Sequence, residues 1–188
     1  MKENKMLILS APSGSGKSTI IQYLLNKGLP LEFSISATTR SPRGNEKHGV
    51  EYYFYSVEEF KQKIANGDFL EFEEVYENRF YGTLKSECER IWSKGNVIVF
   101  DVDVAGGMRL KSLFGDKALS LFIQAPSVEV LRQRLEGRKT DSAEEIQKRI
   151  DKAAYEMQFA NKFDKIVIND DLTRACNDAE QLLREFLG

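Results

Sequence analysis

Histidine and cysteine are scarce in this chain of 188 residues, and each scarcity narrows what the protein can do. The sequence has one histidine, His48, and two cysteines, Cys88 and Cys176. A Ser–His or Cys–His hydrolase would have to be built around His48, which lies in a charged loop typical of a solvated side chain. The cysteines are far apart and lack metal-ligand spacing, which favours small, half-buried thiols in a reduced, cytoplasmic chain.

Long apolar runs and an excess of positive charge are also missing. No apolar run approaches the length needed to span a membrane, and no signal-peptide pattern precedes Leu7. The formal net charge is −2, so no overall positive field attracts nucleic acid. We therefore expect one soluble α/β domain with neither nucleic acid nor a membrane as partner, and any anionic ligand must be bound by a local cluster of arginines.

The most informative stretch is a glycine-rich loop between an apolar run at 6–9 and a helical pattern at 19–25. It reads Ala-Pro-Ser-Gly-Ser-Gly-Lys-Ser at residues 11–18. A strand, a glycine-rich turn and Gly-Lys-Ser at a helix start form a phosphate-binding loop, because the helix N-terminus offers free N–H groups and a positive dipole end. Lys17 can then reach the β- and γ-phosphates, and the Ser18 hydroxyl can ligate Mg²⁺. An ordinary strand–helix turn would not require this motif together with both flanks.

The first position of the loop departs from the general pattern, which begins with glycine. Ala11 stands there and is followed by Pro12. Because proline favours an extended residue before it, we expect Ala11 to have a negative φ, where alanine is unstrained.

A second candidate for phosphate chemistry follows the apolar run at 97–100. Asp101 ends this run, and Asp103 comes two residues later. Ligands of open α/β sheets bind at the carboxyl ends of the strands, and in phosphate-loop proteins an aspartate at such a place helps to hold Mg²⁺. The run therefore predicts a buried parallel strand that carries Asp101 to the metal.

Two groups of arginines are further candidates. Arg40 and Arg43 lie in a loop of hydroxyl residues, and Arg134 and Arg138 share a helical face. Both groups suit an oxyanion. Taken alone, the first group is equally consistent with a solvated basic loop, and the second with a solvated helix face.

Alternating apolar patterns predict the order of elements. Strands are expected at 6–9, 33–37, 50–55, 69–76, 96–101, 119–123 and 165–168. Helices are expected up to 25, from Ser56 to about 66, after a turn at 80–83 up to about 94, near 108–113, from Ser127, from Ser142, and up to 187. This order implies a parallel sheet flanked by helices, with insertions at about 34–86 and 127–155 at its ligand-binding edge.

Eight motifs in one order resemble the guanylate kinase family across almost the entire chain. The motifs are residues 11–18, Ser-x-Thr-Thr-Arg-x-Pro-Arg at 36–43, Gly-x-x-Tyr-x-Phe at 49–54, Phe-Leu-Glu at 69–71, Tyr-Gly-Thr at 81–83, Asp-x-Asp at 101–103, Arg-Leu-x-x-Arg at 134–138 and Asn-Asp-Asp-Leu at 169–172. The departures are small: Ala11, Ala105 and Lys139 stand where the family often has Gly, Gln and Gly.

The resemblance implies the fold and the reaction. The fold would be a phosphate-loop parallel sheet flanked by helices, with an inserted α+β nucleotide-monophosphate-binding domain and a helical lid. The whole chain, 1–188, would be one domain, with a core at 1–33, 87–126 and 156–188, a GMP-binding subdomain at 34–86 and a lid at 127–155. The γ-phosphoryl group of ATP would pass to GMP, and to dGMP, giving ADP and GDP, with Mg²⁺ bound to ATP. The protein would be a cytoplasmic monomer or homodimer.

The resemblance also implies which residues do this work. The catalytic residues would be Lys17, Arg134, Arg138 and Arg149. ATP would bind to Ala11, Pro12, Ser13, Gly14, Ser15, Gly16, Lys17, Ser18, Thr19 and Asn169. The phosphate of GMP would bind to Arg40, Arg43, Tyr52 and Tyr81, and its base to Ser36, Glu71, Thr83 and Asp103. Mg²⁺ would bind to Ser18 and Asp101.

Two rival functions remain at this stage. A phosphokinase of ribose bisphosphate resembles guanylate kinases but would not need a base pocket at Glu71 and Thr83. A non-catalytic guanylate-kinase-like module that binds phosphopeptides would lose the lysine of the phosphate loop and the lid arginines. We favour the enzyme, because the chain has Lys17, Ser18, Asp101, Arg134 and Arg138.

Overall fold

The computed structural model describes residues 4–137 and 142–188, which form two compact units. The core unit comprises Met1–Leu31 and Val99–Gly188, and the inserted unit comprises Glu32–Ile98. None of the helices in the described part of the chain is both long and apolar enough to cross a membrane. The chain therefore leaves the core once and returns to it once.

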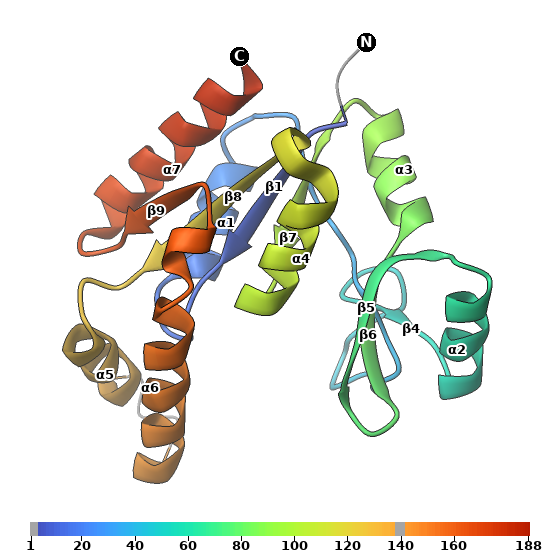
Figure 1. The fold of residues 1–188 in the computed structure, drawn as a ribbon, viewed down its shortest axis with the longest axis horizontal. Helices are drawn as coiled ribbons and strands as arrows, with labels where there is room; N and C mark the ends of the chain where they lie inside the picture. Colours follow the sequence, from blue (N-terminus) through green and yellow to red (C-terminus); the bar gives the residue numbers. More distant parts are fainter. Residues whose placement is uncertain (1–3, 138–141) are drawn as a thin grey trace. The chain divides into compact units, whose positions relative to one another are not determined.

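A five-stranded parallel sheet, in the order β2-β7-β1-β8-β9, organises the core (Figure 1). Its strands are β1 (Met6–Ser10), β2 (Leu31–Phe33), β7 (Val97–Asp101), β8 (Ala118–Gln124) and β9 (Lys165–Ile168). The helical elements of the core unit are α1 (Lys17–Leu25), α4 (Val104–Phe114), η1 (Gly115–Lys117), α5 (Val128–Gly137), α6 (Ala143–Met157), η2 (Ala160–Lys162) and α7 (Leu172–Leu187).

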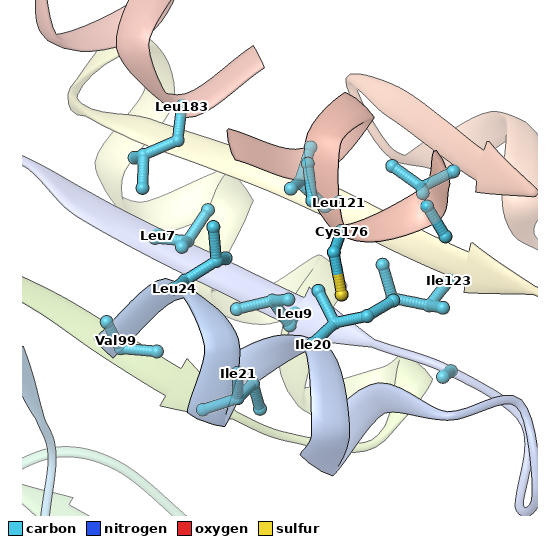
Figure 2. Close-up of a cluster of buried hydrophobic side chains, with 14 of the residues drawn as sticks. Leu7, Leu9, Ile20, Ile21, Leu24, Val99, Leu121, Ile123, Cys176 and Leu183 are labelled. Carbon is cyan, nitrogen blue, oxygen red and sulfur yellow. The ribbon is translucent and has the colours of Figure 1, made fainter. Parts of the chain in front are cut away.

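Both faces of this sheet are buried, which explains the nearly continuous apolar runs in its strands. Figure 2 shows Leu7 and Leu9 of β1 among side chains from α1 and α7, including Ile20 and Leu183. On the opposite face, Phe122 of β8 packs with residues of α4 and η2. A strand covered on both faces needs apolar residues at successive positions, as the sequence of β1 has.

The inserted unit is built on a mixed four-stranded sheet in the order β4-β3-β6-β5. Its elements are β3 (Ala37–Thr38), β4 (Tyr53–Phe54), α2 (Val57–Ala65), β5 (Phe69–Tyr76), β6 (Arg79–Leu84) and α3 (Lys85–Ser93). Phe60 of α2 stacks on Phe69 and Phe80, with ring centroids 4.3 and 5.3 Å away. The aromatic richness of this stretch therefore supplies a separate small core.

Several predicted elements need correction. The stretch 33–37 is not one strand: β2 ends at Phe33, and β3 begins at Ala37 in the other sheet. The turn predicted at 80–83 is wrong, because these residues lie in β6 and pair antiparallel with β5. Tyr-Gly-Thr has the composition of a turn because glycine is common in turns. Gly82 instead lies beside β5 in the sheet, where a Cβ would come within 2.7 Å of the Glu71 carbonyl oxygen.

A network of charged side chains joins β2 to α3 within the inserted unit. Glu32 accepts hydrogen bonds from Arg90, from Lys94 at 2.9 Å and from Asn96 at 2.9 Å. Burial is the largest single influence and raises the pKa of Glu32, but the bonds from Lys94, Arg90 and Asn96 together lower it to about 2. The carboxylate therefore interacts more favourably in the folded state than in the unfolded chain.

Acid is expected to weaken the inserted unit through Glu32. Because the folded-state pKa lies below the ordinary value of 4.5, the stabilisation is complete above that value and is lost as the pH falls towards about 2. Glu32→Gln should therefore lower the free energy of unfolding at neutral pH, and the difference from wild type should shrink below about pH 4. Urea unfolding followed by Trp92 fluorescence measures this, with the exposed Glu89→Gln as control. A difference independent of pH would contradict it.

Candidate active site

The phosphate loop folds as its sequence predicts, and two of its glycines are required by the backbone. Gly14 and Gly16 have φ values of 91° and 92°. A Cβ on Gly16 would lie 2.3 Å from the side-chain nitrogen of Asn169, so both the conformation and the close approach demand glycine. Ala11 is not among the residues with positive φ; within the described chain Asn78 is the one non-glycine residue that is. The expectation for Ala11 is therefore confirmed.

The N-terminus of α1 is left open to a ligand. Gly16 is its N-cap, and no side chain of the described residues caps it. The first turn of α1 also contains no acidic residue, although acids are favourable at that position. The free N–H groups and the dipole of α1 therefore remain available for an anion.

A cavity of about 420 Å³ opens in front of this helix end in the core unit. It is lined by Ala11, Pro12, Ser13, Gly14, Ser15, Gly16, Lys17, Ser18, Thr19, Asp101, Val102, Asp103, Lys152 and Glu156. The structure therefore brings all nine predicted phosphate-loop residues and both predicted aspartates to one cavity.

Lys17 lies across this cavity, against the end of β7. Its ammonium group is 2.5 Å from a carboxylate oxygen of Asp101 and donates to the carbonyl oxygen of Val102 at 3.0 Å. Asp103 serves a second purpose that the sequence analysis missed: it N-caps α4 by accepting the N–H of Gly106 at 2.8 Å. This cap explains why α4 begins at Val104, earlier than predicted.

Lys152 and Glu156 line the cavity without having been predicted. Both lie on α6, one and two turns beyond Arg149, so helical spacing could have placed them on the same face. Glu156 is 7% exposed. Burial raises its pKa, as does Asp103, while Lys152, at 3.6 Å, and Lys17 oppose this. Glu156 is therefore easier to protonate than an exposed glutamate, despite the two lysines nearby.

Two arginines predicted to be catalytic, one on α5 and one on α6, contact different residues at the phosphate loop. Arg149 donates to the hydroxyl of Ser13 at 3.1 Å, and Arg134 donates to the carbonyl oxygen of Asn169 at 2.7 Å. Arg138 lies outside the described residues. The two described arginines therefore contact the phosphate loop or the residue that supports it.

Asn169 holds the phosphate loop through a hydrogen bond to the loop backbone. Its side-chain nitrogen donates to the carbonyl oxygen of Ser15 at 2.7 Å, and its side-chain oxygen is buried without a hydrogen-bond partner in the described structure. Together with Arg134, Gly14 and Gly16 it lines a further cavity of about 440 Å³. An unpartnered buried acceptor beside a cavity is a group that a ligand's N–H can satisfy.

The inserted unit carries the remaining predicted residues in two clusters. In the first, the guanidinium carbon of Arg40 lies 5.1 Å from the ring centre of Tyr52, which is 6.1 Å from that of Tyr81. Glu46 holds Arg40 with two bonds of 2.8 and 3.0 Å and also accepts the N–H of Arg43. These bonds are the largest influence on Arg40 and raise its pKa. The carboxylate of Glu46 thus binds the guanidinium group of Arg40, where an external anion would otherwise bind. The sequence analysis did not predict this role of Glu46.

The second cluster pairs two of the four residues predicted to face the base. The hydroxyl of Thr83 on β6 donates to a carboxylate oxygen of Glu71 on β5 at 2.8 Å. Thr83 is 2% exposed, so a buried hydroxyl group holds the carboxylate of Glu71 in place. Ser36 lies between β2 and β3, and its carbonyl oxygen accepts the N–H of Tyr53 at 2.9 Å.

The donor set fits Mg²⁺ bound together with phosphate. Ser18 and Asp101 offer oxygen ligands in one cavity, and no group of three or more His, Cys, Asp or Glu side chains that could hold a metal occurs in the described chain. Mg²⁺ takes one or two protein oxygens and completes its octahedron with phosphate and water, so a sparse site of this kind suits it.

A parallel sheet with this loop, a lysine at the helix start and an aspartate at the next strand end defines a nucleotide-binding protein of the phosphate-loop class. Comparisons with known proteins narrow the class. A family model described as guanylate kinase matches residues 3–186. The guanylate kinase of Bacteroides fragilis (strain YCH46) is 61% identical over 99% of this chain and 91% of its own length.

Two further relatives agree. The guanylate kinase of Porphyromonas gingivalis is 50% identical over 98% of both chains. A crystal structure of guanylate kinase from Anaplasma phagocytophilum superposes with a TM-score of 0.74 at 29% identity, covering 98% of this chain and 87% of the other. The chain belongs to the guanylate kinase family, and the family predicted from its motifs is confirmed.

Proposed function

We propose that the core-unit cavity holds the triphosphate of ATP, and that the inserted unit holds GMP, so that the γ-phosphoryl group passes between them to give ADP and GDP. One observation carries this proposal: Lys17, Ser18 and Asp101 converge in one cavity at the uncapped N-terminus of α1. The N–H groups of the loop bind phosphate oxygens, and the lysine adds a cation between the two substrates.

Ser18 and Asp101 would hold Mg²⁺ there, and when bound the ion neutralises charge on the phosphates of ATP. Lys17 must leave Asp101 to reach a phosphate, which frees the carboxylate for the metal or for its water ligands. The present ion pair thus keeps the two groups close together until ATP arrives.

The acceptor is a phosphate oxygen of GMP, which is already anionic near neutral pH. No strong general base is needed, and catalysis must come from alignment and from neutralising the repulsion between two anionic substrates. Arg134 and Arg149, with Arg138, would supply this charge from a lid at 127–155. Asn169 would offer its unpartnered oxygen to the amino group of adenine.

GMP would be held by two groups of residues. Arg40, Arg43, Tyr52 and Tyr81 would bind its phosphate, which then takes the place of the Glu46 carboxylate on Arg40. Glu71 would accept the N1–H and N2–H₂ of guanine. Since the hydroxyl of Thr83 has one proton, already donated to Glu71, we assign it to orienting that carboxylate in this conformation. Ser36 and Asp103 would complete the base site.

The remaining assignments are proposals of the same kind. The GMP-binding subdomain would span 34–86 and the core 1–33, 87–126 and 156–188. The protein would use dGMP beside GMP, act in the cytoplasm in purine nucleotide metabolism and GMP recycling, and be a monomer or homodimer.

Arg149→Ala is expected to lower kcat by about 10³-fold while changing the KM for ATP far less, because the guanidinium neutralises charge that develops during transfer. Steady-state ADP release at saturating GMP measures both constants. Lys148→Ala is the matched control, since Lys148 is an exposed cation of the same helix. A folded Arg149→Ala protein whose kcat equals that of Lys148→Ala would contradict the role proposed for Arg149.

A further inference from the structure

The segment 34–36 carries Ser36 but belongs to no strand. It connects β2 to β3, and therefore lacks the ladder of hydrogen bonds that fixes its neighbours. The Ser34 hydroxyl is buried without a partner in the described structure, so it does not anchor the segment either. Two hydrogen bonds do: the carbonyl oxygen of Ser36 accepts the N–H of Tyr53 at 2.9 Å, and the N–H of Ile35 donates to Glu87 at 3.0 Å.

Glu87 lies in the first turn of α3 and is 2% exposed. One carboxylate oxygen accepts the N–H of Ile35 at 3.0 Å and a guanidinium N–H of Arg90 at 2.8 Å. The other accepts the hydroxyl of Tyr53 at 2.9 Å and the Nε–H of Arg90 at 2.8 Å. Four donors converge on this carboxylate, which uses the full accepting capacity of the ionised group.

Only an ionised carboxylate suits this set of donors. Burial is the largest influence and raises the pKa of Glu87, but hydrogen bonds from Arg90, Ile35 and Tyr53 outweigh it and lower the pKa overall. A glutamine of the same size would turn its N–H₂ group towards the two donors that one carboxylate oxygen now accepts and leave both of them unpaired. The charge of Glu87 is therefore part of how the segment 34–36 is held.

Both segments that Glu87 ties together carry or adjoin residues assigned to GMP. Ile35 precedes Ser36, and Tyr53 follows Tyr52 while also bonding to Ser36 through its N–H. Tyr53 also packs against the hydrophobic cluster of the inserted unit, which is formed by Ala37, Phe60, Phe69, Phe80 and Leu84. These apolar contacts do not need the carboxylate of Glu87, so its loss should loosen the acceptor site more than the fold.

We infer that Glu87 is a positioning residue for GMP: it fixes the backbone of Ser36 and Tyr52 from the first turn of α3. The inference rests on the proposed function, which places these two residues at the acceptor. Glu87 touches no substrate and acts through Ile35 and Tyr53, so it should affect the binding of GMP and not the transfer step or the binding of ATP.

The test measures kcat, the KM for GMP and the KM for ATP in Glu87→Gln, together with the Kd for GMP by calorimetry. We expect the KM and the Kd for GMP to rise by about tenfold, with kcat at saturating GMP and the KM for ATP changed by less than about threefold. Glu89→Gln is the control, because Glu89 is an exposed acid of the same helix. Values for Glu87→Gln equal to those of Glu89→Gln would overturn the inference, as would an equal loss for both substrates.

A second variant keeps the test decisive if Glu87→Gln does not fold. Tyr53→Phe removes one donor and keeps the ring, and it should raise the KM for GMP several-fold with kcat preserved. An unchanged KM for GMP in Tyr53→Phe would overturn the inference. Tyr52→Phe separates this failure from failure of the proposed function: if it too leaves the KM for GMP unchanged, the acceptor site itself is wrongly assigned.

Discussion

Replacing Lys17 with methionine is expected to abolish phosphoryl transfer, with kcat at least about 10³-fold lower, while the protein stays folded. Lys17 starts α1 at the edge of the cavity, and its ammonium group contacts the Asp101 carboxylate and the Val102 carbonyl oxygen, not the buried clusters. Methionine keeps the length of the side chain and removes the charge that would lie between the phosphates. The transition state would therefore lose a cation that no neighbouring side chain can replace in the same position.

Single-turnover ADP formation measures the effect, and circular dichroism with thermal unfolding checks the fold. Lys165→Met is the matched control, because Lys165 is an exposed lysine on the edge strand β9. It should keep the kcat of wild type. If folded Lys17→Met protein retained a kcat within a few-fold of Lys165→Met, the phosphate-loop assignment would be wrong.

Glu71→Gln is expected to cause the largest change in the choice of base. Guanine presents N1–H and N2–H₂ side by side, whereas adenine presents a bare N1 and no amino group at C2. An ionised carboxylate only accepts hydrogen bonds, so Glu71 can pair with both guanine donors and finds no partner on adenine. A polar site left unpaired by the wrong ligand can discriminate by about 10⁴–10⁵. Glutamine accepts one guanine donor and opposes the other, so kcat/KM for GMP should fall by about 10²-fold or more, and the ratio of GMP to AMP should narrow.

Arg43→Ala is the matched comparison for this prediction. Arg43 would bind only the phosphate that GMP and AMP share, so its loss should lower kcat/KM for both and leave their ratio nearly intact. The measurement is kcat/KM for GMP and AMP in both variants. A collapsed ratio in Arg43→Ala, with a preserved ratio in Glu71→Gln, would mean that the base pocket is assigned to the wrong residues.

Local signals in the sequence were sufficient for several elements of both units. The apolar run of β1, the glycine pattern at 11–18 and the capping boxes of α2 and α6 each depend on neighbours within a few residues. The predicted strand 69–76 matches β5 at both ends, although its pairing with β6 shifts register near each end. Such features need no knowledge of distant segments, which explains why they were predicted correctly.

The errors fell where pairing between distant segments decides the structure. Residues 80–83 have the composition of a turn, but β5 supplies a partner that makes them a strand. The prediction of a single strand at 33–37 was wrong because the two ends of this stretch belong to different sheets. Likewise, the supporting roles of Glu46, Glu87 and Glu156 involve acids in polar stretches that sequence patterns do not distinguish from solvated ones.

The sequence predicted most of the residues that line the site, but not the hydrogen bonds that these residues make. The cavity contains every predicted phosphate-loop residue, but the sequence did not show that Asp103 caps α4, or that Asn169 holds Ser15. Both side chains contact the protein backbone, and the contact of Asn169 joins residues 154 positions apart in the sequence.

One measurement tests the central claim most directly: coupled ADP release by the wild-type protein over a panel of acceptors, namely GMP, dGMP, AMP, UMP, TMP and ribose 1,5-bisphosphate. We predict rapid turnover with GMP and dGMP, values of kcat/KM for AMP, UMP and TMP that are lower by orders of magnitude, and none with ribose 1,5-bisphosphate. Turnover with ribose 1,5-bisphosphate in preference to GMP, or no ADP release with any acceptor, would contradict the account.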